Sequence, residues 1–140
     1  MASDATRAVT IERTGPGRFV ATNVRGGTVP IGSGDSSEFS PVELLLAAVA
    51  GCSGIDVEAL TSRLAEPEGF TMTASADKLR DEQGNHLGPV SVSVSVTFPD
   101  GADGDAARGR LPEAVAMSRD RLCTVSRTVL LPTPVSYEVL

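Results

Sequence analysis

The stretch FSPVELLLAAVAGCSGIDVEALTSRL, residues 39–64, decides the fold of this 140-residue chain. It predicts one long helix with Cys52 near its middle. Ser40 and Glu43 have the spacing of a capping box, and Pro41 fits the first helical position, where an N–H is not needed. Apolar residues surround the helix on nearly all sides, so we expect a buried, central helix. Cys52 would then lie deep among small residues.

The sequence on either side of this helix predicts antiparallel sheet. Residues 7–12 and 18–23 alternate in polarity around a Gly-Pro turn and form an expected hairpin. Residues 90–98 alternate valine with serine, which is typical of a strand with one covered face. The other expected elements are strands at 28–32, 70–79 and 135–140 and helices at 105–121 and 123–131. This order indicates a single α+β domain, residues 1–140, with antiparallel sheets packed around the central helix.

Charge and hydropathy narrow the function classes. The net charge is −6 and the basic residues are scattered, so we expect no nucleic-acid partner. The N-terminus lacks the order of a secretory signal, and no run of about 18 apolar residues is present. We therefore expect no membrane partner and a cytoplasmic location.

The thiols of the two cysteines, Cys52 and Cys123, are the main candidates for a reactive group. In a reducing cytoplasm such thiols are free, catalytic or redox-active more often than they form a permanent disulfide. Together with the single histidine, His86, they give at most three soft ligands, and no CxxC spacing occurs. We therefore expect no metal and no cofactor. The alternative for both cysteines is a structural role as small apolar side chains.

The two cysteines differ in how each could become a thiolate. Cys123 lies at a predicted helix start, close after two arginines, so its pKa should be lowered. Cys52 lies mid-helix, where the helix dipole has little effect, and it needs a cation from elsewhere in the fold. The candidate cations are Arg13, Arg18, Arg25 and Arg127.

Three carboxylates of the central helix have simpler explanations than catalysis. The capping box accounts for Glu43 as structure, although the same carboxylate can also orient an arginine. Asp56 and Glu58 are expected to be solvated or locally paired. His86 lies in a predicted turn and should be exposed.

Two motifs resemble the OsmC/Ohr family of osmotically inducible and organic-hydroperoxide-resistance proteins. They are SPVELLLAAVAGCSGIDV, residues 40–57, and LCTVSRTV, residues 122–129; the VSYEV of residues 135–139 also fits. The amino-acid sequence of the first motif is more similar to the OsmC-like branch of the family. The resemblance implies an intertwined α+β homodimer with its thiol site at the subunit interface.

The resemblance also implies a chemistry, defence against oxidative stress by a thiol-dependent peroxidase. Cys52 would attack an organic hydroperoxide and become a sulfenic acid, and Cys123 would resolve it to a disulfide. A dithiol, often on a lipoylated protein, would be the reductant. Arg18 best matches the family's arginine, and Glu43 stands one place later than the family's glutamate. The alternative is a non-peroxidase OsmC-like protein that binds an apolar small molecule or a thiol adduct at the dimer interface.

Overall fold

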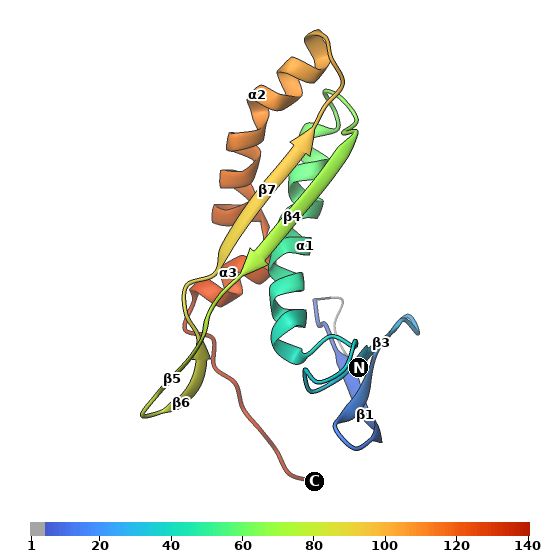
Figure 1. The fold of residues 1–140 in the computed structure, drawn as a ribbon, viewed down its shortest axis with the longest axis vertical. Helices are drawn as coiled ribbons and strands as arrows, with labels where there is room; N and C mark the ends of the chain where they lie inside the picture. The colour runs from blue at the N-terminus through green and yellow to red at the C-terminus, as the bar shows by residue number, and fades with distance from the viewer. Residues whose placement is uncertain (1–4) are drawn as a thin grey trace. The chain divides into compact units, whose positions relative to one another are not determined.

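The computed structural model describes residues 5–140 (Figure 1). The chain falls into two compact units, one up to residue 45 and one from residue 46 to 140. The first unit is a three-stranded antiparallel sheet with the order β1-β2-β3. Its strands are β1 (Val9–Gly15), β2 (Arg18–Asn23) and β3 (Thr28–Ile31). The hairpin and the short third strand expected from the sequence are therefore confirmed.

Helix α1 (Pro41–Thr61) begins in the first unit and continues into the second. The predicted capping box is present at its start. The Ser40 N–H donates to Oε1 of Glu43 at 2.9 Å, and the Glu43 N–H donates to Oγ of Ser40 at 3.3 Å. Local sequence is enough to place this end of the helix, because both partners lie within one turn.

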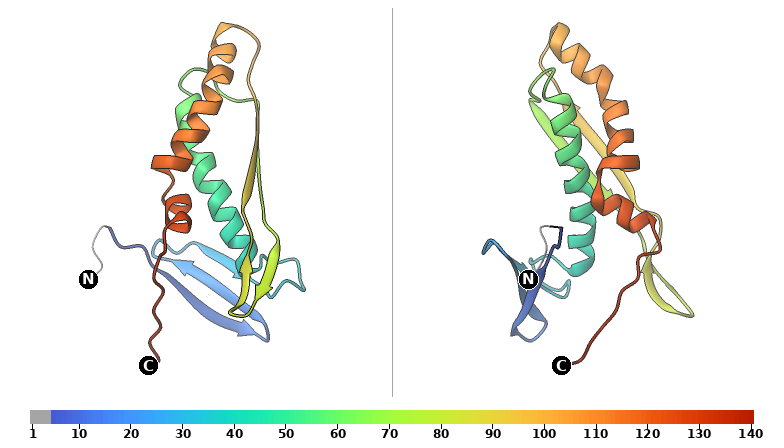
Figure 2. Two further views of the ribbon diagram at one scale, coloured as in Figure 1. Left: turned by 90° about the vertical axis from the view of Figure 1, so that its left-hand side faces the viewer. Right: turned by 180° about the vertical axis from the view of Figure 1, so that it is seen from behind.

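The second unit combines helices with two antiparallel pairs of strands. The long pair is β4 (Gly69–Ser75) with β7 (Ser91–Thr97), and the short pair is β5 (Lys78–Asp81) with β6 (Gly84–Leu87). The chain continues through α2 (Ala102–Met117), a π-helical turn η1 (Ser118–Leu122) and α3 (Thr124–Leu130). From residue 46 onward, α1 lies beside α2, and both pack on one face of the β4–β7 ribbon (Figure 2).

The position of α1 differs from the expectation of a helix buried all round. Only Val49, Val57 and Thr61 of this helix are buried, whereas Ile55 is 71% exposed and Cys52 is half-buried. In the single chain β4, β7 and α2 cover one side of the helix, so its remaining apolar surface faces outward. The prediction that Cys52 lies deep is therefore wrong for the chain taken alone.

By length and composition, α1 could cross a membrane, with a mean hydropathy of 1.6 over its most apolar 18 residues. The expectation that the sequence holds no such stretch is therefore wrong. The core helix of a soluble protein passes the same test. Such a core helix is mostly buried, whereas 17% of this window is buried here, and Gly54 marks its close packing against Met72 of β4, 3.2 Å from an added methyl group.

Three element predictions need correction. The strand expected at 70–79 ends at Ser75, and a separate hairpin, β5–β6, occupies the predicted turn region. The helix expected at 105–121 runs instead from Ala102 to Met117 with Pro112 inside it. Residues 135–140 form no strand, since the described part of the chain gives them no strand to pair with.

Candidate active site

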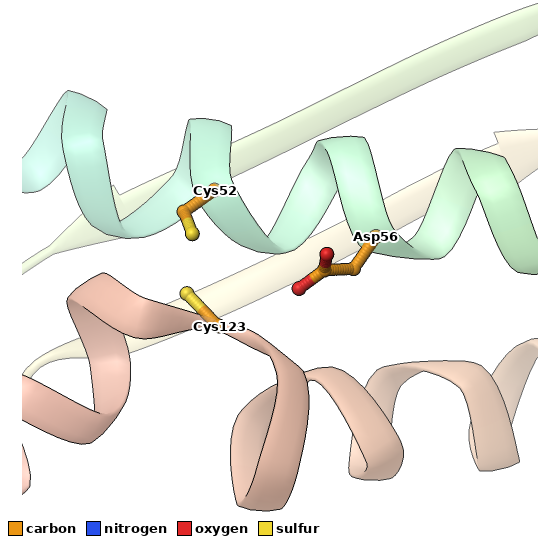
Figure 3. A group of neighbouring side chains, drawn as sticks. All are labelled: Cys52, Asp56 and Cys123. Carbon is orange, nitrogen blue, oxygen red and sulfur yellow. The ribbon is translucent and has the colours of Figure 1, made fainter. Parts of the chain in front are cut away.

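Both cysteines lie in the second unit, and the fold brings their sulfur atoms together. Sγ of Cys52, Sγ of Cys123 and a carboxylate oxygen of Asp56 all lie within 4.8 Å of one another. Figure 3 shows the two sulfurs and the carboxylate facing the same space between α1 and the segment that precedes α3. Cys52 and Asp56 are four residues apart on α1 and therefore share a helix face. Two thiols that are distant in the sequence thus meet beside a carboxylate.

Cys123 is positioned by the π-helical turn that precedes it. Its N–H donates to the carbonyl of Ser118 at 2.8 Å, and the next residues form α3. Cys123 is the N-cap of α3, and its sulfur accepts a hydrogen bond from the Ser126 N–H at 3.3 Å. The side chain is fully buried, at 0% exposure. The predicted helix start at Cys123 is confirmed.

Asp56 was expected to be solvated or locally paired, and the structure corrects this. Its Oδ2 accepts a hydrogen bond from Oγ of Ser118 at 2.8 Å, and Ser118 is itself fully buried. The same serine therefore holds Asp56 through its hydroxyl and Cys123 through its carbonyl. The sequence does place Asp56 one helical turn after Cys52, but it gives no sign of the contact with Ser118.

The pKa of the Cys123 thiol is below its ordinary value. Burial raises this pKa, but hydrogen bonds to the sulfur from Cys52, Ser126 and Ser53 lower it by more. The lowered pKa predicted for Cys123 is confirmed in direction, with a different cause. We expected nearby arginines to lower it, and hydrogen-bond donors do so instead.

The pKa of the Cys52 thiol is above its ordinary value. Burial is the largest cause, followed by the hydrogen bond to Cys123, and the charge of Asp56 adds to them; a backbone hydrogen bond from Val125 acts in the opposite direction. Within residues 46–140, no cation is among the groups that shift this pKa. The hydrogen bond between the two thiols therefore shifts their pKa values in opposite directions.

The other two site candidates, Arg18 and Glu43, lie in the first unit and are engaged there. Nη1 of Arg18 lies 3.8 Å from Oε1 of Glu38. Glu43 closes the capping box, and its hydrogen bonds with the backbone and side chain of Ser40 lower its pKa. Each residue therefore has a structural partner of its own. His86, on β6, is exposed as expected and has Asp81 at 3.5 Å.

The second unit contains an apolar pocket whose wall includes neighbours of the two cysteines but neither cysteine itself. Its volume is about 310 Å³, within the range of small-molecule sites. Ser53 and Ser126, which both hydrogen-bond to Cys123, form part of its wall. Most of the remaining wall is apolar and comes from α1, β4, β7, α2 and α3, and η1 adds the charged side chain of Arg119.

Solved structures place this architecture in a known class. An OsmC-like protein of unknown function from Vibrio cholerae aligns with a TM-score of 0.73 at 10% identity, over 92% of this chain and 95% of that one. The organic hydroperoxide resistance protein OhrB of Bacillus subtilis aligns with a TM-score of 0.53 at 19% identity, over 88% and 90%. At these identities the likeness is one of fold, and the α+β fold is that of OsmC-like structures.

The chain belongs to the family of OsmC-like proteins, whose family model matches residues 33–138. An uncharacterized protein of Mycobacterium tuberculosis is 31% identical over 132 residues, which cover 93% of each chain. The resemblance noted in the two cysteine motifs is thereby confirmed at the level of the family.

Proposed function

We propose that this protein is a thiol-dependent peroxidase that reduces organic hydroperoxides. The observation that carries the proposal is the meeting of Cys52 and Cys123, whose sulfurs lie within 4.8 Å of each other. A disulfide has an S–S bond of about 2.05 Å, so the two sulfurs must move closer together before they can bond. Cys52 is half-buried and Cys123 fully buried, which makes Cys52 the sulfur that a substrate reaches first.

The first step is a proton transfer inside the pair. The lowered pKa of Cys123 and the raised pKa of Cys52 favour a thiolate on the first and a thiol on the second. At rest the proton therefore stays on Cys52, and it passes along the shared hydrogen bond to Cys123 only as the sulfur attacks the peroxide. This proton transfer needs no cation from the second unit.

The second step is oxygen transfer from the hydroperoxide. The Cys52 thiolate attacks the terminal peroxide oxygen, an S–O bond forms and the O–O bond breaks. The alkoxide that leaves takes the proton now held by Cys123 and departs as an alcohol. Cys52 is then a sulfenic acid, and Cys123 is again a thiolate.

The third step closes the disulfide. The Cys123 thiolate attacks the Cys52 sulfur, an S–S bond forms, and hydroxide leaves and is protonated to water. Two electrons have passed from the sulfurs to the peroxide. An external dithiol, of the kind carried by a lipoylated protein, returns the pair to its reduced state by thiol–disulfide exchange.

The apolar pocket, which reaches the site through Ser53 and Ser126, supports an organic substrate. Its apolar wall favours a hydroperoxide with a hydrocarbon group over hydrogen peroxide, because burying that group in the pocket is favourable. Defence against oxidative stress in the cytoplasm is the role that this chemistry would serve.

A peroxide-consumption assay with Cys52→Ser tests the proposal. We expect the wild-type chain to consume cumene hydroperoxide in the presence of a dithiol and the variant to consume none above background. Glu113→Gln, an exposed position on α2, is the control and should retain full turnover. Turnover in Cys52→Ser equal to wild type would remove this sulfur from the mechanism.

A binding protein without peroxidase activity is the second candidate. The raised pKa of Cys52, with no cation of the second unit acting on it, favours this reading because an unactivated thiol reacts slowly. The apolar pocket would then hold a small molecule. A chain that shows no peroxide consumption but binds a fluorescent apolar probe equally well with and without Cys52 would support this candidate.

We also propose that the two units form one OsmC-like domain that works as a homodimer. The family match from residue 33 to 138 crosses the boundary between the units. The tail after α3 is extended and apolar, with Val135, Tyr137 and Val139 exposed by 72%, 93% and 98%. Such surface is typical of a protein–protein contact. Sedimentation should give twice the mass of one chain, and a monomer would contradict the proposal.

A further inference from the structure

We infer that Cys52, Asp56 and Cys123 form a binding site for a thiophilic divalent cation, with Zn²⁺ as its ligand. Each residue contributes one ligand atom, and the three atoms lie within 4.8 Å of one another (Figure 3). In a tetrahedral zinc site the Zn–S bonds are about 2.3 Å, so the two sulfurs would stand roughly 3.8 Å apart. The three ligand atoms are therefore already close to the spacing that a metal requires.

The three ligand residues are fixed by the backbone and by a shared partner. Cys52 and Asp56 occupy positions i and i+4 of α1, which face the same side of the helix. Ser118 contacts two of the three ligand residues. Its hydroxyl donates to Oδ2 of Asp56 at 2.8 Å, and its carbonyl accepts from the N–H of Cys123 at 2.8 Å. A fully buried serine that orients two ligands is the kind of outer-shell support found in metal sites.

Asp56 can bind a metal while it keeps this hydrogen bond. A carboxylate offers about four lone-pair positions on two oxygens, and the Ser118 hydroxyl uses one of them. Loss of the Ser118 hydroxyl would leave the carboxylate free to rotate. It would therefore weaken the site without removing a ligand.

The donor set selects the metal. Two sulfurs and one carboxylate oxygen favour Zn²⁺ over Mg²⁺ or Ca²⁺, which prefer oxygen ligands alone. Three protein ligands leave one position of a tetrahedral ion open for water or another small ligand. Cys123 is fully buried and Cys52 is half-buried, so the ion would enter from the Cys52 side.

Metal binding and disulfide formation would exclude each other. A disulfide between Cys52 and Cys123 removes two of the three ligands, and a bound ion holds both sulfurs as metal thiolates. The inference does not depend on the proposed peroxidase, because the site is complete in the reduced protein. Zn²⁺ bound here would instead protect the reduced pair from oxidation.

The test uses the full-length, reduced and metal-free protein without any peroxide. Zn²⁺ is titrated in competition with a chromophoric chelator, and Cd²⁺ is titrated in parallel to observe the sulfur-to-metal charge-transfer band. We expect one ion per chain and a Cd²⁺ band that disappears in the Cys52→Ser, Cys123→Ser double variant. Asp56→Asn should weaken Zn²⁺ binding at least about 10-fold, and Ser118→Ala should weaken it by a similar factor.

Glu58→Gln is the matched control, since it removes an exposed carboxylate from the same helix and should leave Zn²⁺ affinity unchanged. Circular dichroism of each variant verifies that it is folded. The inference is overturned if the wild-type chain binds no stoichiometric ion, or if Asp56→Asn and Glu58→Gln bind Zn²⁺ equally well. Loss of peroxidase activity alone would leave these titrations unaffected, so the two proposals fail separately.

Discussion

The residues expected to form one site divide between two regions that use them very differently. In the first unit, Glu43 closes the capping box of α1, and Arg18 pairs with Glu38. In the second unit, Cys52 and Cys123 come from distant segments and meet beside a carboxylate. Partners within a few residues explain Glu43 completely, whereas nothing local explains why the two sulfurs meet.

This difference separates residues that have a local structural role from residues that are candidates for a reaction. A polar group that is satisfied by its sequence neighbours contributes to stability at that point, as the Ser40–Glu43 pair does. A fully buried serine that ties a helix carboxylate to a cysteine in another segment has no such local reason. We therefore assign reactivity to the second region, and the following predictions test that division.

The largest expected effect is on turnover in Cys123→Ser. In the proposed mechanism, this variant loses both the acceptor of the Cys52 proton and the thiol that resolves the sulfenic acid. The rate of steady-state peroxide consumption should fall at least about 100-fold, because a positioned proton acceptor typically contributes a rate factor of about that size or more. A dimedone adduct on Cys52, seen by mass spectrometry, should accumulate after one turnover.

Glu43→Gln in the same assay shows whether the two regions differ as proposed. Glutamine can still occupy its place in the capping box, so turnover should stay within about twofold of wild type. A loss as large as that of Cys123→Ser would return Glu43 to the catalytic machinery and would erase the distinction between the regions.

The next effect is on the pH at which each thiol ionises. Cys52→Ala removes the hydrogen bond that lowers the pKa of Cys123, so this thiol should ionise at higher pH than in wild type. Cys123→Ala removes a cause of the raised pKa of Cys52, so that thiol should ionise at lower pH than in wild type. Thiolate absorbance measured against pH checks both shifts, and shifts in the opposite directions would exclude the proposed proton sharing.

The same two pKa values affect stability with opposite signs. The folded pKa of Cys123 is lowered, so its contribution is present above the unfolded thiol value of about 8.5 and is lost as the pH falls through the folded pKa. The folded pKa of Cys52 is raised, so its contribution is present below the unfolded value and is lost as the pH rises through the folded pKa. Urea unfolding of the two single variants across this pH range separates the contributions.

Sequence reasoning succeeded where the cause is local. The start of α1 follows from Ser40, Pro41 and Glu43, and strand β7 follows from the valine–serine alternation of residues 90–98. Both features depend on the spacing of residues only a few positions apart, which can be read from a single sequence.

It failed where the cause lies in another segment. Residues 135–140 alternate like a strand, but a strand needs a partner, and the described residues supply none. The apolar faces of α1 predicted burial, yet the chain alone covers one side of the helix. The role of Asp56 depends on Ser118, which a π-helical turn brings back to α1, and this turn has no signature that we recognised.

A smaller effect is expected on stability when the capping box is opened. Ser40→Ala removes the Oγ that accepts from the Glu43 N–H and should lower the free energy of unfolding by about 1 kcal/mol. Glu43→Gln should lower it by less, because its amide oxygen can still accept from the Ser40 N–H. Urea denaturation gives both values. Equal losses of several kcal/mol would show that Glu43 has a partner beyond Ser40.

The smallest expected effect belongs to Arg18→Gln. The ion pair with Glu38 is long at 3.8 Å and the arginine side chain is 60% exposed, so its loss should change the free energy of unfolding by less than about 0.5 kcal/mol. Cys52 reactivity toward an alkylating reagent should also stay the same, because in the proposed mechanism Cys123, and not Arg18, accepts the Cys52 proton. Unchanged stability combined with a large fall in Cys52 alkylation would show that Arg18 activates this sulfur, and the two regions would then form one site.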